Sequence, residues 1–133
     1  LSVGKLNAFI DDKLKDESLE PEALALVGFS QGTMMSLHIA PRRDRAIAGV
    51  VGFSGRLLVP ELLEAEARVK PPVLLIHGDA DQMVPFEDMG RAGNALVEAG
   101  FETYAHVMKG TGHGIAPDGL QVALSFLLDK LPS

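Results

Sequence analysis

Three continuous apolar runs, each of strand length, constrain the fold of this chain more than any other feature. They cover residues 23–29, 46–53 and 73–77. Continuous apolarity is typical of a parallel strand that helices cover on both faces, whereas a strand with one solvated face alternates polar and apolar side chains. Segments with helical spacing lie between these runs. The sequence therefore predicts an α/β fold with a mainly parallel sheet.

Five segments have the apolar spacing of helices: residues 2–15, 31–40, 61–68, 86–99 and 120–131. Four leucines of the last segment are expected to lie on one face of its helix: Leu120, Leu124, Leu127 and Leu128. Residues 102–108 alternate polar and apolar, as a half-exposed edge strand does. We therefore expect about four mainly parallel strands with flanking helices. Because the first three strands all have the pattern of interior strands, one edge of the sheet is expected to lack its neighbour.

The composition excludes several classes of function. The formal net charge is −6, and the only dense basic patch, residues 42–45, contains Asp44, so we expect no nucleic-acid partner. The absence of cysteine excludes disulfides, thiolate metal sites and a thiol nucleophile. The longest uncharged run, residues 23–41, is interrupted by Gly28, Ser30 and Gly32, so we expect no transmembrane segment. No signal-peptide pattern opens the chain, and we expect a cytoplasmic protein.

Residues 28–32 read G-F-S-Q-G, a G-x-S-x-G pattern between an apolar strand and a helix. Such a strained turn lifts Ser30 clear of the sheet, and bulk at either glycine is expected to collide with the neighbouring strand or helix. The turn also places the amide of Gln31 at a helix N-terminus, where it would stabilise an oxyanion. The alternative is a tight turn with a serine cap. Both the strand and the helix favour Ser30 as a nucleophile.

Residues 52–56, G-F-S-G-R, repeat the first three letters of that pattern. They lack its last glycine, and no helix follows at once. We therefore expect Ser54 to lie in a loop that lines the site and to have a structural role.

A serine nucleophile needs a base, and that base needs an orienting carboxylate. Asp79 and Asp81 follow the third strand, at the edge of the sheet where open α/β folds bind ligands. The residues alone leave open which aspartate has the role, since either suits a turn. His113 lies between glycines in the loop after the last strand, which frees its backbone to present the imidazole over the sheet. An ordinary loop histidine is the alternative.

The other three histidines are expected to be packed, structural or surface residues: His38, His77 and His106.

Nucleophile, acid and base in this order, each after a different strand, match the α/β-hydrolase triad. The chain resembles the phospholipase/carboxylesterase family of α/β-hydrolases, which includes acyl-protein thioesterases. Four segments carry the resemblance: GFSQG at 28–32, FSG at 53–55, HGDADQMVP at 77–85 and GTGHGI at 110–115. It implies Ser30 as nucleophile, Asp81 as acid and His113 as base, with Asp79 as a turn residue. It also implies hydrolysis of carboxylic esters, lysophospholipids or thioesters without a metal or organic cofactor.

The implied reaction proceeds through an acyl-enzyme on Ser30, with the Gln31 N–H as an oxyanion donor. Three apolar residues near these loops are expected to form the acyl pocket, or equally to belong to the core: Leu57, Leu58 and Met83. The partner is a small acyl ester, and a homodimer is left open. A related peptidase or acyltransferase is the alternative enzyme, and a non-catalytic α/β module is the alternative outside enzymes.

The length of the chain and its resemblance to the family together predict its domain organisation. We expect residues 1–133 to form a single domain that is the C-terminal portion of a larger hydrolase. The family has further strands before the nucleophile strand and a Gly-rich loop that supplies a second oxyanion donor. Neither is found in this sequence.

Overall fold

The structure is a computed structural model that describes residues 2–132; positions 1 and 133 lie outside the described residues. Its sheet has four parallel strands, which confirms the predicted sheet. They lie in sequence order: β1 (Ala25–Phe29), β2 (Gly49–Phe53), β3 (Val73–Gly78) and β4 (Thr103–Met108). Because all four are parallel, their carboxyl ends meet at one edge of the sheet.

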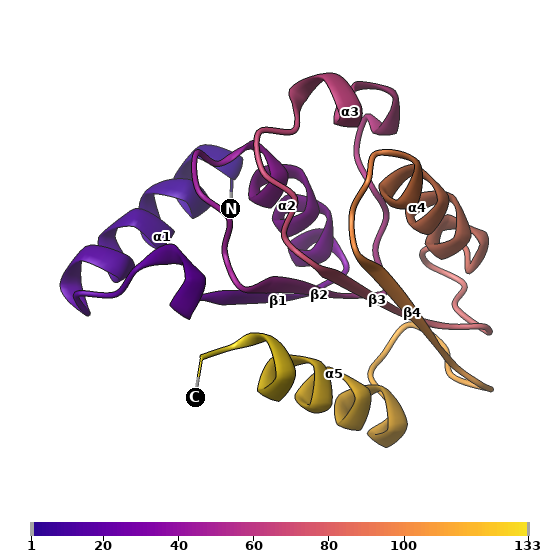
Figure 1. The fold of residues 1–133 in the computed structure, drawn as a ribbon. Helices are drawn as coiled ribbons and strands as arrows, with labels where there is room; N and C mark the ends of the chain where they lie inside the picture. The colour runs from indigo at the N-terminus through magenta and orange to yellow at the C-terminus, as the bar shows by residue number, and fades with distance from the viewer. Residues whose placement is uncertain (1, 133) are drawn as a thin grey trace.

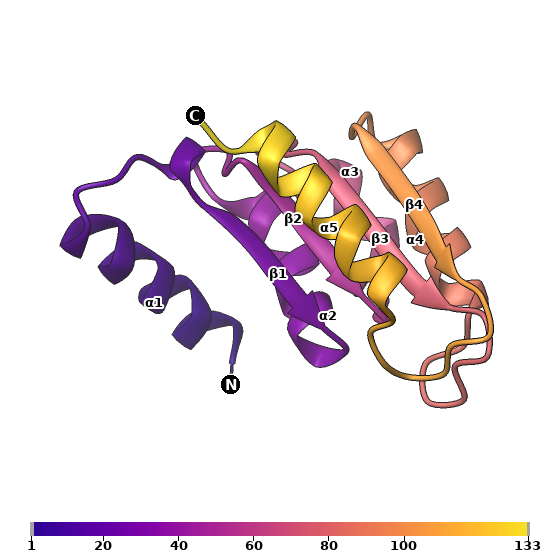
Figure 2. The ribbon, with the colours of Figure 1, turned by 90° about the horizontal axis from the view of Figure 1, so that it is seen from below.

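Helices cover both faces of the sheet (Figure 1). One face carries α1 (Val3–Asp16), α2 (Gln31–Ile39), α3 (Leu63–Glu66) and α4 (Glu87–Glu98). The other face carries α5 (Pro117–Lys130). Seen from below, α5 crosses the middle strands and leaves β1 uncovered on that side (Figure 2). Short 3₁₀ turns lie at Pro21–Ala23, Ala40–Arg42 and Pro60–Leu62.

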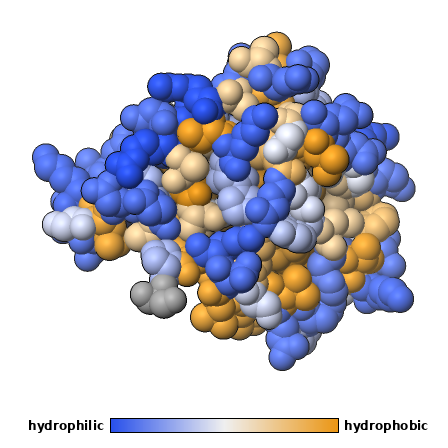
Figure 3. Space-filling model, viewed as in Figure 1, coloured by the Kyte–Doolittle hydropathy of each residue, from blue (hydrophilic) through white to orange (hydrophobic). Residues whose placement is uncertain are grey.

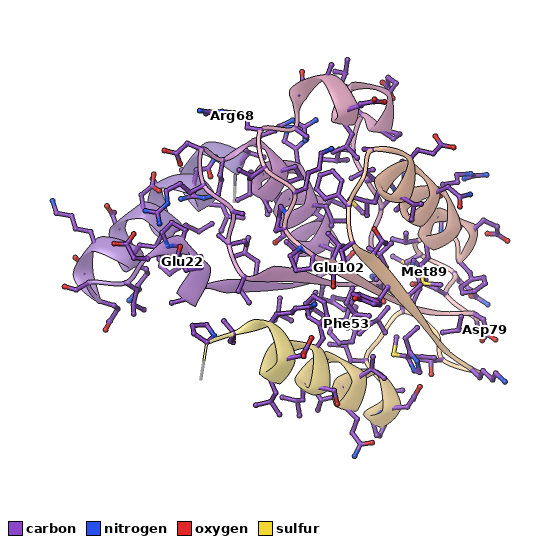
Figure 4. The ribbon with its side chains drawn as sticks, viewed as in Figure 1. Glu22, Phe53, Arg68, Asp79, Met89 and Glu102 are labelled. Carbon is purple, nitrogen blue, oxygen red and sulfur yellow. The ribbon has the colours of Figure 1, made fainter. Side chains whose placement is uncertain are left out.

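The core consists of a layer on each side of the sheet. Val50 and Leu75 face α2 and α4, where they join Leu37 and Leu96. Phe53 faces α5 and packs with several other side chains: Val51, Leu74, Ile76, Met108, Ala123 and Phe126. Figure 4 shows Phe53 between the sheet and α5. Every residue of β2 and β3 is buried, which explains why their sequences are continuously apolar.

The predicted helix at 61–68 is shorter than expected. Only Leu63–Glu66 is α-helical, after a 3₁₀ turn. The backbone N–H groups of Arg68 and Val69 donate to the Pro41 carbonyl at 2.8 and 3.2 Å. These bonds to another segment draw the chain out of the helix before the predicted end.

The leucine face of the last helix is not the face that packs most closely on the sheet, although Leu127 is partly buried against the core. Leu120, Leu124 and Leu128 are 52%, 51% and 83% exposed, and Figure 3 shows apolar surface at the bottom of the molecule, where α5 lies in the same view of Figure 1. The buried residues of α5 are Gly119, Ala123 and Phe126. A Cβ at Gly119 would lie 2.5 Å from Met108 Sδ, so the helix approaches the sheet along its small residues instead.

The two edges of the sheet differ. β4 is an edge strand, as its alternation predicts. β1 forms the other edge although its sequence is apolar, and Val27 and Phe29 are 54% and 38% exposed. Among residues 2–132, no helix has both the length and the apolarity that a membrane crossing requires.

Candidate active site

Ser30 is the single residue between β1 and α2, and its backbone is strained. Its φ of 55° and ψ of −113° lie outside the regions that a serine ordinarily adopts. Such a conformation costs about 1–3 kcal/mol and persists only where the surroundings impose it. Here the N–H of Ser30 donates to the Phe53 carbonyl at 2.9 Å, which fixes the turn to the end of β2.

The two glycines around Ser30 have different roles. A Cβ at Gly28 would lie 2.5 Å from the Thr33 nitrogen and 2.6 Å from the Gly32 carbonyl carbon. At Gly32, a Cβ would meet no atom of the described residues within 4 Å. The expected collision is therefore confirmed at Gly28, where the first turn of α2 lies against the strand, and wrong at Gly32, where there is open space.

The side chain of Thr33 stabilises the turn that carries Ser30. It is buried, and its Oγ1 donates to the Phe53 carbonyl at 2.7 Å, the same oxygen that accepts from Ser30 N–H. Added Cβ atoms at Gly52 and Gly55 would lie 2.6 and 2.5 Å from Thr33 Cγ2. Residues at the end of β2 therefore pack tightly against this methyl group. The Phe53 carbonyl accepts hydrogen bonds from Ser30 and Thr33, which lie at the two ends of the first turn of α2.

The three residues of the predicted triad lie within hydrogen-bond distance of one another. His113 Nε2 is 3.2 Å from Ser30 Oγ, and His113 Nδ1 is 2.8 Å from Asp81 Oδ2. A carboxylate accepts only, so Nδ1 carries the proton, and the neutral ring then accepts from the serine hydroxyl at Nε2. The residues follow β1, β3 and β4, whose carboxyl ends meet at this edge. The arrangement can move a proton from Ser30 to His113.

Asp81 is held as an ionised carboxylate. Its side chain has no exposed surface, and its Oδ1 accepts from the N–H groups of Met83 and Val84 at 2.8 and 2.9 Å. Burial raises the pKa of Asp81, but the hydrogen bonds from His113, Val84 and Met83 together lower it below its ordinary value. The carboxylate therefore stays negative beside the imidazole.

The second aspartate, Asp79, holds the loop that carries His113. Its Oδ1 accepts from the Gly110 N–H at 2.7 Å, and the Ala80 N–H donates to the Thr111 carbonyl at 3.0 Å. In Figure 4, Asp79 lies at the carboxyl end of β3. The residues alone left the two aspartates equivalent. In the structure, Asp81 contacts the imidazole and Asp79 contacts the backbone of the neighbouring loop.

Two further neighbours of the triad were not identified from the sequence as part of the site. The Phe29 ring lies with its centroid 4.8 Å from that of His113. His77 is buried, as expected of a packed histidine, but its Nε2 also lies 2.9 Å from the Val84 carbonyl. Phe29 occupies the variable position of G-x-S-x-G, so the pattern itself carries no signal for it. The position of His77 four residues before Asp81 is a signal that could have been used.

The remaining histidines lie elsewhere. His106 pairs with Asp118 at 2.7 Å, at the start of α5. His38 lies in the last turn of α2, where burial lowers its pKa.

The remaining predicted site residues have varied surroundings. Gln31 is the first residue of α2, a position whose N–H has no acceptor within the helix. Leu57 is buried in the core layer under α2 and α4, Leu58 is half-buried and Met83 is 72% exposed. The acyl-pocket role of these three stays a prediction. Ser54 is fully buried, and its hydroxyl has no hydrogen-bond partner among the described residues, so it presents no hydroxyl at the surface of the site.

The chemistry of the side chains, rather than the depth of a hollow, identifies this site. An apolar hollow of about 310 Å³ lies between the sheet and α5, lined by residues that include Leu74, Tyr104 and Phe126. None of the triad lines it. Among residues 2–132, no group of three or more histidine, aspartate or glutamate side chains is arranged to hold a metal ion.

Comparison with known proteins agrees with the motifs. The phospholipase/carboxylesterase family profile matches residues 2–130. An acyl-protein thioesterase 1 of Gibberella zeae is 30% identical over 88% of this chain and 52% of its own. A probable carboxylesterase of Oryza sativa is 34% identical over 98% of this chain and 50% of its own. The crystal structure of esterase PE8 matches with a TM-score of 0.92 and 44% identity, over 95% of this chain and 59% of that one.

The chain thus spans about half the length of the curated relatives it matches. The fold of the described residues is that of an α/β-hydrolase, with four parallel strands in sequence order and a strained turn at Ser30. By the family match and the similarity of its structure, the chain belongs to the phospholipase/carboxylesterase family.

Proposed function

We propose that this chain carries the triad of a serine hydrolase that cleaves carboxylic esters, including thioesters or lysophospholipids, through an acyl-enzyme on Ser30. The hydrogen-bonded chain from Ser30 through His113 to Asp81 carries the proposal. Relatives named as acyl-protein thioesterase and probable carboxylesterase support the class of substrate. The proposed substrate is a small acyl ester.

In the first half of the reaction, His113 Nε2 takes the hydroxyl proton as Ser30 Oγ forms a bond to the acyl carbon. Asp81 stabilises the imidazolium that results. The tetrahedral intermediate then collapses, the bond to the leaving oxygen or sulfur breaks, and His113 returns the proton to that atom. In the second half, His113 takes a proton from water as the water oxygen forms a bond to the acyl carbon; the bond from that carbon to Ser30 Oγ then breaks, His113 returns the proton to Oγ, and the acid leaves.

The N–H of Gln31 is the oxyanion donor in this proposal. It stands at the start of α2, where the helix dipole favours a negative charge. The family resemblance implies a second donor from a Gly-rich loop that this sequence does not contain. Because one donor is typically worth about 10²–10³ in rate, we expect the described residues alone to turn over ester slowly.

We further propose that residues 1–133 belong to one longer α/β-hydrolase domain whose other strands pair with β1. β1 has a strand partner on one side only among the described residues, and its side chains Val27 and Phe29 are partly exposed. Relatives about twice as long support this. Labelling by a fluorophosphonate, compared between this chain and a version extended at its N-terminus, tests it: equal labelling rates would contradict the proposal.

The function is tested by substituting Ser30 with Ala in the intact, active protein. We expect loss of ester hydrolysis and of fluorophosphonate labelling with an unchanged fold. Turnover at the original rate in the purified variant would overturn the assignment. A panel of matched esters, thioesters and amides separates an esterase from a peptidase, and added alcohol acceptors reveal acyl transfer. The predicted cytoplasmic location and the homodimer stay predictions, which cell fractionation and sedimentation test.

A further inference from the structure

His77 is a buried neighbour of the Asp81 carboxylate. It lies in β3, four residues before Asp81, and is 1% exposed. Its Nε2 is 2.9 Å from the Val84 carbonyl oxygen and 3.4 Å from Asp81 Oδ2. Both neighbours are acceptors, so Nε2 carries the ring proton and donates to Val84.

Val84 connects the two side chains. Its carbonyl accepts from His77, and its N–H donates to Asp81 Oδ1 at 2.9 Å. Val84 itself is buried, so water does not readily replace either of these two hydrogen bonds. A displacement of the His77 ring therefore moves the residue that holds one carboxylate oxygen of Asp81.

The other carboxylate oxygen of Asp81, Oδ2, lies close to His77 itself. Asp81 Oδ2 accepts from His113 Nδ1 at 2.8 Å and also lies 3.4 Å from His77 Nε2. The Phe86 ring meets the His77 ring edge to face, with centroids 6.1 Å apart, which holds the orientation of the imidazole. This one ring therefore lies close to Oδ2 directly and is linked to Oδ1 through Val84, while the Met83 N–H is the other donor to Oδ1.

We propose that His77 is a positioning residue that fixes the Asp81 carboxylate against His113. This inference rests on the proposed function of Ser30, His113 and Asp81. His77 touches no reacting atom, and its effect passes through Asp81 alone. The donor at Nε2 is the part of the side chain that matters, rather than the charge or the aromatic ring.

Three substitutions in the intact, active protein separate the donor from the ring. His77→Phe keeps a ring of similar shape and removes the donor. His77→Gln places an amide nitrogen near the position of Nε2, and His77→Asn places it near Nδ1, too far from Val84. We expect kcat to fall about tenfold to 100-fold in the Phe and Asn variants with little change in KM, since a displacement of about 1 Å at a catalytic group has that effect. The Gln variant retains most of the activity.

A double-mutant cycle with Asp81→Asn tests whether His77 acts through Asp81. We expect His77→Phe to lower kcat in the wild-type background and to change it little when Asp81 is already Asn. An equal loss in both backgrounds would show an independent, merely structural effect and would overturn the inference. If the Phe variant does not fold, the comparison of the Gln and Asn variants carries the same test in both backgrounds.

Proton NMR gives a readout that does not depend on turnover. The His113 Nδ1–H shared with Asp81 is expected to give a strongly downfield resonance in the wild-type and Gln proteins. That resonance should shift or vanish in the Asn and Phe variants.

The Ser30→Ala variant keeps the two proposals separate. If that variant retains activity, the proposed function fails. If it is inactive while folded His77→Asn keeps the wild-type kcat, only the role of His77 fails.

Discussion

The backbone of Thr111 crosses so close to Gly78 that a Cβ at Gly78 would overlap the Thr111 carbonyl oxygen. The same Cβ would lie 2.5 Å from the Gly112 carbonyl oxygen. The loop between β4 and α5 therefore passes over the end of β3 at backbone contact distance. This approach is what brings His113 to Asp81.

Substitution of Gly78 with Ala is expected to displace that loop. The methyl group has no space, so we expect a loss of about 1–3 kcal/mol in the free energy of unfolding from overpacking. We also expect a fall in kcat of about 100-fold if the imidazole moves by about 1 Å. Denaturant unfolding and ester hydrolysis by the intact protein measure the two effects.

Gly114→Ala is the matched control, because a Cβ at Gly114 meets no atom of the described residues within 4 Å. We expect it to retain both stability and rate. Equal losses in the two variants would mean that the loop is sensitive to any methyl group, against our interpretation of Gly78.

Asp79 and Asp81 should differ in how much activity is lost when each is replaced by asparagine. Asp79 only accepts from the Gly110 N–H, and an asparagine carbonyl oxygen can replace it. Asp81 must hold the imidazole in one tautomer, which an amide does not, so we expect a fall in kcat of up to about 10⁴-fold in Asp81→Asn. Asp79→Asn should keep most of the rate, while Asp79→Ala should lower it by releasing the loop. Steady-state kinetics on the three variants decides; a large loss in Asp79→Asn alone would reverse the assignment.

Most of the fold could be predicted from the sequence, because burial on both faces imposes continuous apolarity on a parallel strand. The runs that became β2 and β3 are buried throughout. The order of Ser30, an aspartate and His113 was also readable, since each follows a strand whose carboxyl end meets the same edge. What the residues alone could not decide was which aspartate faces the imidazole, because Asp79 and Asp81 have the same chemistry and differ only by two positions in a turn.

The stability of the protein should depend on pH through Asp81. The pKa of Asp81 is lowered in the folded state from an ordinary value of 3.8. Between the folded pKa and this ordinary value, the unfolded state therefore binds more protons than the folded state. The stabilisation by Asp81 is therefore fully present above about pH 4 and is lost as pH falls through the lower, folded pKa. Denaturant unfolding of wild-type protein and Asp81→Asn from pH 7 to pH 2 measures it. The difference between the two should shrink as pH falls below 4, and a constant difference would argue against the shift.

Thr33→Val should destabilise the turn that carries Ser30. The valine keeps the shape and removes the hydrogen bond from Oγ1 to the Phe53 carbonyl, worth about 1 kcal/mol. The buried carbonyl still accepts from the Ser30 N–H, so the cost should not greatly exceed that value. Thr33→Ser keeps the hydroxyl and removes the methyl group that Gly52 and Gly55 enclose. Equilibrium unfolding of the two variants separates the hydrogen bond from the packing.

The leucine spacing of α5 does not identify the face that packs on the sheet, for a physical reason. Leu120, Leu124 and Leu128 form an apolar stripe, but Gly119 and Ala123 allow a closer approach of the helix axis to the sheet. Hydrophobic periodicity reports which face is apolar and carries no information on how near a helix can come. The contact of His77 with Val84 was missed in a similar way, since it depends on a turn whose path is set by Asp81.

The hydrogen bond between Ser30 and His113 joins residues that are 83 positions apart in the chain. No local element can form it, because the turn at Ser30 and the loop that carries His113 meet only when all four strands of the sheet are paired. During refolding, formation of the Ser30–His113 contact should therefore follow the slowest long-range strand pairing rather than the formation of helices. A chain stalled with native helical content and an unpaired β4 would keep Ser30 and His113 apart.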